Sequence, residues 1–341
     1  MAGFGKRFAD WFTGRDAEKG PISVGGQAVM EGVMMKGPKY MAVAVRDASG
    51  RIQVKRKPVK QLSKKYPFLG WPIIRGVVNF FVMLVSGMKT LMDSAEMAGG
   101  EVEEPSAFEK KVAKALHMKP DDVMMIFAVV LALVLAVGLF FMIPTALETL
   151  IKKAVKSRVL VNLCGGVIRI LVFLTYVLLV SRLKEIRRVF QYHGAEHKTV
   201  FCYEHKLPLT VENAQKFTTL HPRCGTSFLV IVMVISILVF TLLGTDSSNV
   251  FKRMGSRLLL LPLVAGVSYE VLRALGRAKD TPLVCALRWP GLMVQKITTA
   301  QPDDSMVEVA ICSLKYALDM PDYLPKEQAA DEAKPEEPKG E

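Results

Sequence analysis

The sequence predicts an all-α polytopic membrane protein with about four transmembrane helices, one interfacial or re-entrant helix and a small N-terminal β-hairpin region. Of its 341 residues, 51% are hydrophobic, and the mean hydropathy is +0.28. A soluble chain is about 45–50% apolar, but here the apolar residues form long blocks with the charges between them. This pattern excludes a disordered chain, a coiled coil and a collagen-like chain.

Four apolar blocks are the predicted membrane-spanning helices of a region at residues 123–275. They are residues 123–147, 159–181, 227–244 and 258–272. A helix needs about 20 apolar residues to cross the hydrocarbon core, and the first two blocks exceed this length. Arg169 is the only charge in the second block, and Glu270 lies near the end of the fourth. Charges at such depth are costly, so we expect both side chains to face the bundle interior and to have partners.

Residues 68–92 form a weaker candidate. They contain Pro72, Arg75 and Lys89, and their uninterrupted apolar core, residues 76–88, is only 13 positions long. Apolar stretches of about 10–14 residues are typical of interfacial, re-entrant or buried helices. We therefore predict an interfacial or re-entrant helix here.

The distribution of cations predicts the orientation. Residues 1–67 contain 14 Lys or Arg, and the loop at residues 182–226 contains eight. The positive-inside rule places both segments in the cytoplasm, which four spans permit and a fifth span at residues 68–92 would not. The expectation is a multi-pass protein of the plasma membrane with cytoplasmic N- and C-termini.

The other segments have simpler predictions. Residues 1–67 form a basic cytoplasmic region with a Gly-rich motif at residues 25–38 and a β-hairpin at residues 41–58. Residues 93–122 are a cytoplasmic linker. Residues 276–325 form a cytoplasmic C-terminal region with an amphipathic helix at residues 306–318, and residues 326–341 are a disordered tail rich in Ala, Glu, Lys and Pro.

The basic N-terminal region also indicates a partner. Residues 51–65 hold seven cations and no acid. Beside transmembrane helices, such a run binds the anionic headgroups of the lipid bilayer. Contact with RNA or the ribosome is the less favoured alternative.

Four of the five histidines lie in the loop at residues 182–226. His193-Gly194-Ala195-Glu196-His197 has the H-x-x-E-H spacing of inverted zinc peptidases. On a helix, residues i and i+4 share a face, so His193 and His197 could ligate one metal ion. Glu196 would then be the general base of a hydrolase.

A third ligand could come from His221, Cys224 or Glu270. The first two lie in His221-Pro222-Arg223-Cys224-Gly225, just before the third span, and Glu270 lies 73 residues after His197. Zinc is the expected ion, and another divalent metal is the alternative. Simpler interpretations stand beside this one, because juxtamembrane histidines also hydrogen bond to carbonyls and headgroups, and Glu270 could pair with an arginine.

Several long motifs are similar to those of a known family. They are Gly25-Gly26-Gln27-Ala28-Val29-Met30-Glu31-Gly32-Val33-Met34-Met35, Arg75-Gly76, the His193–His197 motif with Lys198, His221-Pro222-Arg223-Cys224-Gly225-Thr226-Ser227, Ser268-Tyr269-Glu270, and Thr298-Thr299 followed by Pro302-Asp303-Asp304. In these motifs, residues 21–320 resemble the YqhQ-type family of uncharacterised bacterial membrane proteins. The resemblance implies a predicted metal-dependent enzyme.

Two functional hypotheses follow. The first is a membrane-embedded, metal-dependent hydrolase of unknown substrate with its site at the cytoplasmic face. The second is a non-enzymatic membrane assembly or transport factor in which the metal is structural. Three protein ligands with an open fourth position favour the enzyme, and a closed four-ligand site favours the structural role.

Overall fold

The computed structural model describes residues 24–59, 66–99, 113–114, 120–243, 249–279 and 281–320. The chain divides into two compact units. The sheet unit comprises Met1–Gly100, Val177–Ile231 and Ala265–Glu341, and the helical unit comprises Glu101–Tyr176 and Val232–Val264. The predicted disordered tail at residues 326–341 lies outside the described residues, as does most of the predicted linker after residue 99.

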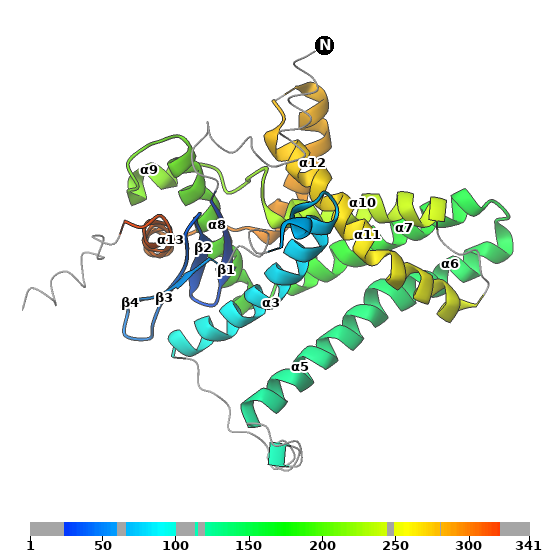
Figure 1. The fold of residues 1–341 in the computed structure, drawn as a ribbon, viewed down its shortest axis with the longest axis horizontal. Coiled ribbons are helices and arrows are strands. Elements are labelled where there is room, and N and C mark those ends of the chain that lie inside the picture. The colour runs from blue at the N-terminus through cyan, green and yellow to red at the C-terminus, as the bar shows by residue number, and fades with distance from the viewer. Residues whose placement is uncertain are drawn as a thin grey trace, which may run out of the picture. The chain divides into compact units, whose positions relative to one another are not determined.

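The sheet unit contains a four-stranded antiparallel sheet with strand order β1-β2-β3-β4 (Figure 1). The strands are β1 Gly25–Val29, β2 Gly32–Lys36, β3 Tyr40–Arg46 and β4 Ile52–Pro58. The predicted hairpin at residues 41–58 is confirmed as the β3–β4 pair, in which Val43 lies opposite Lys55.

The Gly-rich motif forms a second hairpin, β1–β2, that the sequence analysis did not predict. Glycine is depleted in strands, and the turn between β1 and β2 is made by Met30 and Glu31, of which Glu31 has a positive φ of 51°. The N-terminal hairpin region is therefore a complete sheet of four strands.

The two faces of the sheet carry different helices because side chains alternate along each strand. Val33 and Met35 of β2 face a core that also contains side chains of α8 (Lys184–Glu204) and α13 (Asp304–Ala317). Met34 faces the other side, where it packs with Met97 at the end of α3 (Ile74–Met97). Both faces are thus covered, which explains why β2 is almost entirely buried.

The predicted helix at residues 306–318 is confirmed as α13, and it lies deeper than an amphipathic surface helix would. Met306, Ile311 and Leu314 are at most 1% exposed. Asp303 caps its first turn by accepting a hydrogen bond from the backbone N–H of Met306 at 2.9 Å. A further helix, α12 (Pro282–Thr298), precedes it and was not predicted.

Within the described residues, five helices are long and apolar enough to cross a membrane. They are α3, the continuous helix α5–η3–α6 (Pro120–Val137, Gly138–Met142 and Ile143–Ala154), α7 (Arg158–Val180), α10 (Gly225–Leu243) and α11 (Val250–Arg277). The four predicted blocks fall in the last four of these, although α11 is much longer than residues 258–272. α3 extends five residues beyond the predicted end at residue 92, into the segment predicted as a linker.

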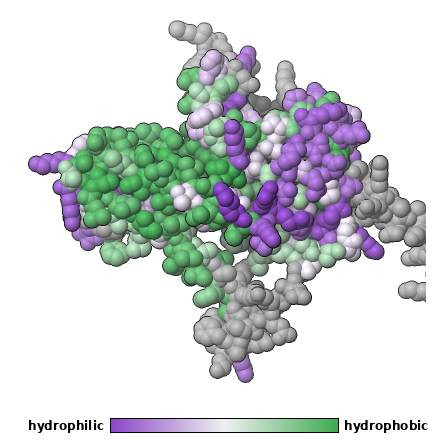
Figure 2. All heavy atoms as spheres, turned by 180° about the vertical axis from the view of Figure 1, so that it is seen from behind, coloured by the Kyte–Doolittle hydropathy of each residue, from purple (hydrophilic) through white to green (hydrophobic). Residues whose placement is uncertain are grey.

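The surface of the apolar helices is dominated by hydrophobic side chains, whereas the surface around the sheet is hydrophilic (Figure 2). Exposed leucines such as Leu179, Leu242 and Leu259 are 66–82% accessible. Soluble proteins rarely expose such extended apolar surfaces, and the chain is therefore typical of a multi-pass membrane protein in this respect.

Candidate metal centre

Helix α8 places the two histidines of the H-x-x-E-H motif on one face, as their spacing predicts. The ring centroids of His193 and His197 are 4.4 Å apart. Gly194 between them allows the chain after α12 to approach α8, because a Cβ atom at this position would lie 2.2 Å from the carbonyl oxygen of Ala300. The helix-weakening glycine is thus explained by this close approach.

Both imidazoles are held through their Nδ1 atoms. Nδ1 of His193 lies 2.8 Å from the carbonyl oxygen of Thr298, and Nδ1 of His197 contacts the carbonyl oxygen of Thr219. A carbonyl oxygen only accepts hydrogen bonds, so in each neutral ring Nδ1 carries the proton and Nε2 keeps its lone pair. Metal-bound histidines are oriented in this way in most proteins.

Cys224 completes a set of three potential ligands. Its Sγ lies 3.1 Å from Nε2 of His193, and the ligand atoms of His193, His197 and Cys224 all lie within 4.8 Å of one another. Cys224 directly precedes α10, where Sγ accepts a hydrogen bond from the backbone N–H of Thr226 at 3.4 Å. Cysteine binds a metal ion through its sulfur atom, as the thiolate.

His221 lies beside this set but does not join it. Its ring centroid is 5.6 Å from that of His197. Nδ1 of His221 accepts the backbone N–H of Arg223 at 3.2 Å, and Nε2 lies 3.3 Å from a carboxylate oxygen of Glu204. Both ring nitrogens are therefore engaged, so this predicted ligand has no lone pair to offer in this conformation.

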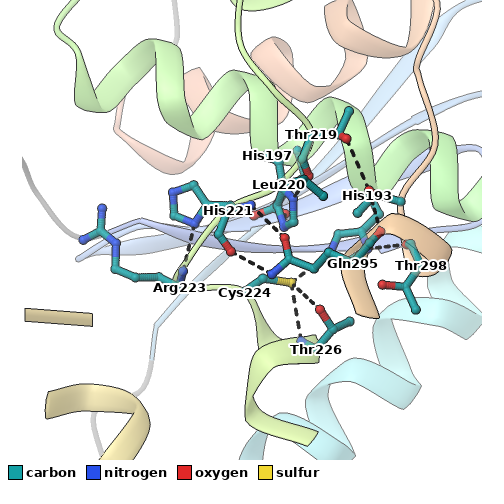
Figure 3. Close-up of polar contacts among 12 residues, drawn as sticks. His193, His197, Thr219, Leu220, His221, Arg223, Cys224, Thr226, Gln295 and Thr298 are labelled. Carbon is teal, nitrogen blue, oxygen red and sulfur yellow. Dashed lines mark hydrogen bonds and ion pairs between the residues drawn. The ribbon is translucent and has the colours of Figure 1, made fainter. Parts of the chain in front are cut away.

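Gln295 of α12 holds the segment that carries His221 and Cys224 (Figure 3). Its Oε1 accepts the backbone N–H of His221 at 2.7 Å, and its Nε2 donates to the carbonyl oxygen of His221 at 2.8 Å and to Oγ of Ser227 at 3.0 Å. Gln295 is completely buried. No local pattern in the sequence indicates this residue, because its partners His221 and Ser227 lie 74 and 68 positions away.

Glu196 is buried between α8 and the first strand. One carboxylate oxygen lies 3.5 Å from Nε2 of His197, and the carboxylate accepts the backbone N–H of Gly26. Burial raises the pKa of the Glu196 carboxyl, and the nearby His193 and His221 partly oppose this shift. A Cβ atom at residue 26 would lie 2.6 Å from Cγ of Glu196. The Gly-rich motif therefore lies against the histidine motif, a contact the sequence analysis did not foresee.

Glu270 lies elsewhere in the sheet unit, and the structure does not bring it together with the histidines. Its two carboxylate oxygens accept hydrogen bonds from Nε and Nη2 of Arg75 at 2.6 and 2.5 Å. The pair links α11 to the start of α3. Of the two interpretations of Glu270, metal ligand or partner of an arginine, the geometry favours the partner, and the 73-residue spacing to His197 was a misleading signal.

One polar atom in the site makes no hydrogen bond with the described residues. It is Nε2 of His197, whose side chain is 2% exposed and whose nearest polar neighbour in an ion-pair contact is the Glu196 carboxylate at 3.5 Å. A buried polar atom without a partner is unfavourable and rare. Two imidazole nitrogens and one sulfur are a donor set that suits Zn²⁺, and a bound ion would engage this nitrogen. The residues present therefore fit a zinc ion.

Comparisons with known proteins give the family but not the chemistry. The chain is 34% identical over 305 residues to the uncharacterized protein YqhQ of Bacillus subtilis (strain 168), which covers 88% of this chain and 93% of that protein. No solved structure matches the chain. The model of the family DUF1385, described as "Protein of unknown function", matches residues 71–320, and the chain therefore belongs to the DUF1385 family.

Proposed function

We propose that this protein is a metal-dependent hydrolase whose zinc ion is held by His193, His197 and Cys224 at the N-terminal end of α10. The observation that carries the proposal is the buried Nε2 of His197, which makes no hydrogen bond with the described residues and lies within 4.8 Å of the other two ligand atoms. The fixed Nδ1 contacts of both histidines support it, because they orient the lone pairs before an ion binds.

The number of ligands favours catalysis over a structural role. Three protein ligands leave the fourth position of a tetrahedral zinc ion for water or substrate, whereas structural sites have four protein ligands. His221 lies beside the set, but its engagement with Arg223 and Glu204 keeps it out of it. A non-enzymatic assembly or transport factor with a closed site is the alternative.

Glu196 is the group best placed to accept a proton from an attacking water molecule. It follows His193 by three residues and so shares its face of α8. The N–H of Gly26 fixes the carboxylate, and burial keeps bulk water from competing for it. A zinc ion would act as a Lewis acid on a carbonyl or phosphoryl group of the substrate, and Glu196 would accept the proton of the attacking water molecule.

The topology that we propose rests on the core of the sheet unit. The strands, α8 and α13 share one buried core. In the chain, however, apolar helices separate them: α3, α5–η3–α6 and α7 lie between the strands and α8, and α10 and α11 lie between α8 and α13. Segments that pack against one another lie on the same side of a membrane. The chain therefore crosses an even number of times between β4 and α8, and again between α8 and α13.

Three candidate helices lie between β4 and α8, so one of them does not cross. We assign this role to α3, which has the lowest mean hydropathy of the five. Its last turns pack on the sheet, and its Asp93 binds Lys57 of β4 at 2.7 Å. Four spans remain, and the positive-inside rule then puts both termini on the cytoplasmic side of the plasma membrane.

The bilayer is also the proposed partner of the basic N-terminal region, and the ion pairs of this region narrow the contact to a few of its cations. Three cations of this run, Lys55, Arg56 and Lys57, form ion pairs within the chain, to Glu96, Asp319 and Asp93 respectively. Lys60, Lys64 and Lys65 lie outside the described residues. We therefore assign contact with anionic headgroups to these last three lysines.

Metal analysis of the purified full-length protein tests the proposed centre. After purification with a chelator wash and restoration of zinc, the parent should retain about one zinc ion per chain, as three converging ligands predict. His197→Ala should lose most of it. His205→Ala is the matched control, because His205 is exposed directly after the same helix and its Nδ1 contacts the carbonyl oxygen of Phe201. Equal zinc content in all three proteins would refute the metal site.

A further inference from the structure

The segment that joins α9 (Val211–Gln215) to α10 carries the ligand Cys224 and the carbonyl oxygen of Thr219, which contacts Nδ1 of His197. Residues 216–224 contain no helix or strand. The ladder of hydrogen bonds that fixes a regular element therefore does not fix the Thr219 carbonyl oxygen. Its position depends on turns within the segment and on contacts with other parts of the chain.

Lys198 makes two such contacts at the start of the segment. It directly follows His197 on α8, and its Nζ donates to the carbonyl oxygen of Gln215 at 2.9 Å and to that of Phe217 at 2.7 Å. Gln215 is the last residue of α9, where carbonyl oxygens lack partners within the helix. Phe217 lies two residues before Thr219, so the lysine attaches the chain to α8 just ahead of the carbonyl that holds His197.

The attachment is shielded from solvent. Lysine usually keeps its ammonium group in water and buries only its apolar stem, but Lys198 is 3% exposed. Hydrogen bonds from a charged donor are roughly twice as strong as those between neutral groups. At a buried position, water competes little for the two carbonyl oxygens. Lys198 therefore holds the end of α9 firmly against α8.

The other contacts of the segment come from different parts of the chain. Oγ1 of Thr299 donates to Oγ1 of Thr219 at 3.3 Å, and Gln295 of α12 holds the backbone of His221. Lys198 differs because it belongs to the helix that carries His197. The imidazole ring and its carbonyl partner are thus both tied to adjacent residues of α8, which keeps their relative position constant when other elements move.

We infer that Lys198 is a positioning residue of the metal centre, which keeps the carbonyl oxygen of Thr219 on Nδ1 of His197 by holding residues 215–217 against α8. The inference rests on the proposed metal centre and gives Lys198 no contact with the ion. Loss of an outer partner of a metal ligand lowers metal affinity about 10–100-fold. Since Lys198 acts through such a partner, its loss should weaken zinc binding by about tenfold, the lower end of this range.

The test measures zinc affinity of the full-length protein in an uncharged detergent, by competition with a chelator. Lys198→Met removes both hydrogen bonds and should bind zinc about tenfold more weakly than the parent. Lys198→Arg keeps a buried cation with several donors and should recover most of the affinity. Lys216→Met is the matched control, because it removes an exposed lysine of the same segment whose Nζ contacts Oδ1 of Asn213 at 3.0 Å. It should bind zinc as the parent does.

A second readout separates positioning from a general loss of stability. In zinc-loaded protein with isotope-labelled histidine, nuclear magnetic resonance reports how fast each Nδ1–H exchanges with water. Lys198→Met should accelerate exchange at His197, whose partner is Thr219, and should leave His193, whose partner is Thr298, at the rate of the parent. A merely structural role of Lys198 would change both rates together.

Two results would overturn the inference while the metal centre stands. One is equal zinc affinity of the parent and Lys198→Met, and the other is equal acceleration of exchange at both histidines. Failure of the metal centre itself looks different, because the parent would then bind no zinc. If Lys198→Met does not fold, Lys198→Gln takes its place, since its amide can still donate to one carbonyl oxygen. It should bind zinc more weakly than the parent, and an unchanged affinity would also refute the role of Lys198.

Discussion

His197 contacts the carbonyl oxygen of Thr219 through Nδ1, and the opposite nitrogen of the same ring, Nε2, is buried and makes no hydrogen bond with the described residues. This relationship fixes the tautomer of the imidazole and directs a lone pair toward the ligand atoms of His193 and Cys224. The site is therefore organised before an ion binds, and this reduces the entropy that ion binding must overcome.

The first prediction concerns Cys224. Loss of an outer partner of a ligand already lowers metal affinity about 10–100-fold, so loss of the ligand itself in Cys224→Ser should have a larger effect. Cobalt substitution makes the thiolate visible, because Co²⁺ bound to sulfur gives a charge-transfer absorption in the near ultraviolet. The parent should show this band and Cys224→Ser should lack it. Cys202→Ser, which changes a buried thiol outside the site, should keep it.

The second prediction separates Glu196 from the ligands. Glu196→Gln should retain zinc, because the carboxylate is not among the three converging ligand atoms, and should abolish function, because an amide cannot accept the proton. The measurement is complementation of a strain that lacks the gene, together with zinc content. Glu185→Gln, at an exposed position of the same helix, should complement fully. Full complementation by Glu196→Gln would remove the central residue of the hydrolase proposal.

The third prediction uses two adjacent glycines. A Cβ atom on Gly26 would lie 2.6 Å from Cγ of Glu196 and 2.9 Å from the backbone oxygen of Met34, whereas a Cβ atom on Gly25 would have no neighbour within 4 Å. Gly26→Ala should lower the free energy of unfolding by about 1–3 kcal/mol through overpacking and should displace Glu196. Gly25→Ala should be close to neutral. Unfolding midpoints of the two variants that agree within error would contradict this contact.

The local parts of the structure could be predicted from the sequence, because their signals are local. The i, i+4 spacing of His193 and His197 needs only helix geometry, and the β3–β4 hairpin needs only alternation around an Ala48-Ser49-Gly50 turn. The apolar blocks likewise predicted four of the five described helices that could cross a membrane, and residues 68–92 predicted the fifth, α3, as an interfacial or re-entrant helix. In each case, neighbouring residues carry the information.

The other parts depend on contacts between distant residues. Gly26 contacts Glu196 across 170 positions, and Arg75 binds Glu270 across 195. No spacing rule identifies such partners, so Glu270 was a candidate ligand until Arg75 was found beside it. The burial of α13 was missed for the same reason, since its amphipathic pattern does not reveal that sheet and helices cover it on several sides.

The fourth prediction compares two ion pairs that differ in burial. Arg75 and Glu270 have side chains 10% and 11% exposed, whereas those of Arg188 and Glu31 are 53% and 32% exposed. Breaking the buried pair with Glu270→Gln should lower the free energy of unfolding by about 3–5 kcal/mol. Glu31→Gln should cost no more than about 1 kcal/mol. Zinc content should be unchanged in both, and loss of zinc from Glu270→Gln at a temperature where it stays folded would restore Glu270 as a ligand.

The last prediction concerns topology, because the shared core requires the sheet, α8 and α13 to lie on the same side of the membrane. Single cysteines at Ser49 in the β3–β4 turn, Leu207 after α8 and Met320 after α13 occupy exposed positions around one core. In intact cells, all three should be protected from a membrane-impermeant maleimide, and all three should react after permeabilisation. Their behaviour must agree, because packed segments cannot lie on opposite sides of a bilayer.

The control for this experiment is a cysteine at Ser157, between α6 and α7, which should react in intact cells because the four-span topology puts that loop outside. The background should have its five native cysteines replaced, since Cys285 is exposed. Labelling of all three test positions from outside would reverse the orientation. Labelling of the cysteine at position 49 alone would mean that α3 crosses the membrane. The sheet would then lie on the opposite side from α8 and α13, and their shared core could not form.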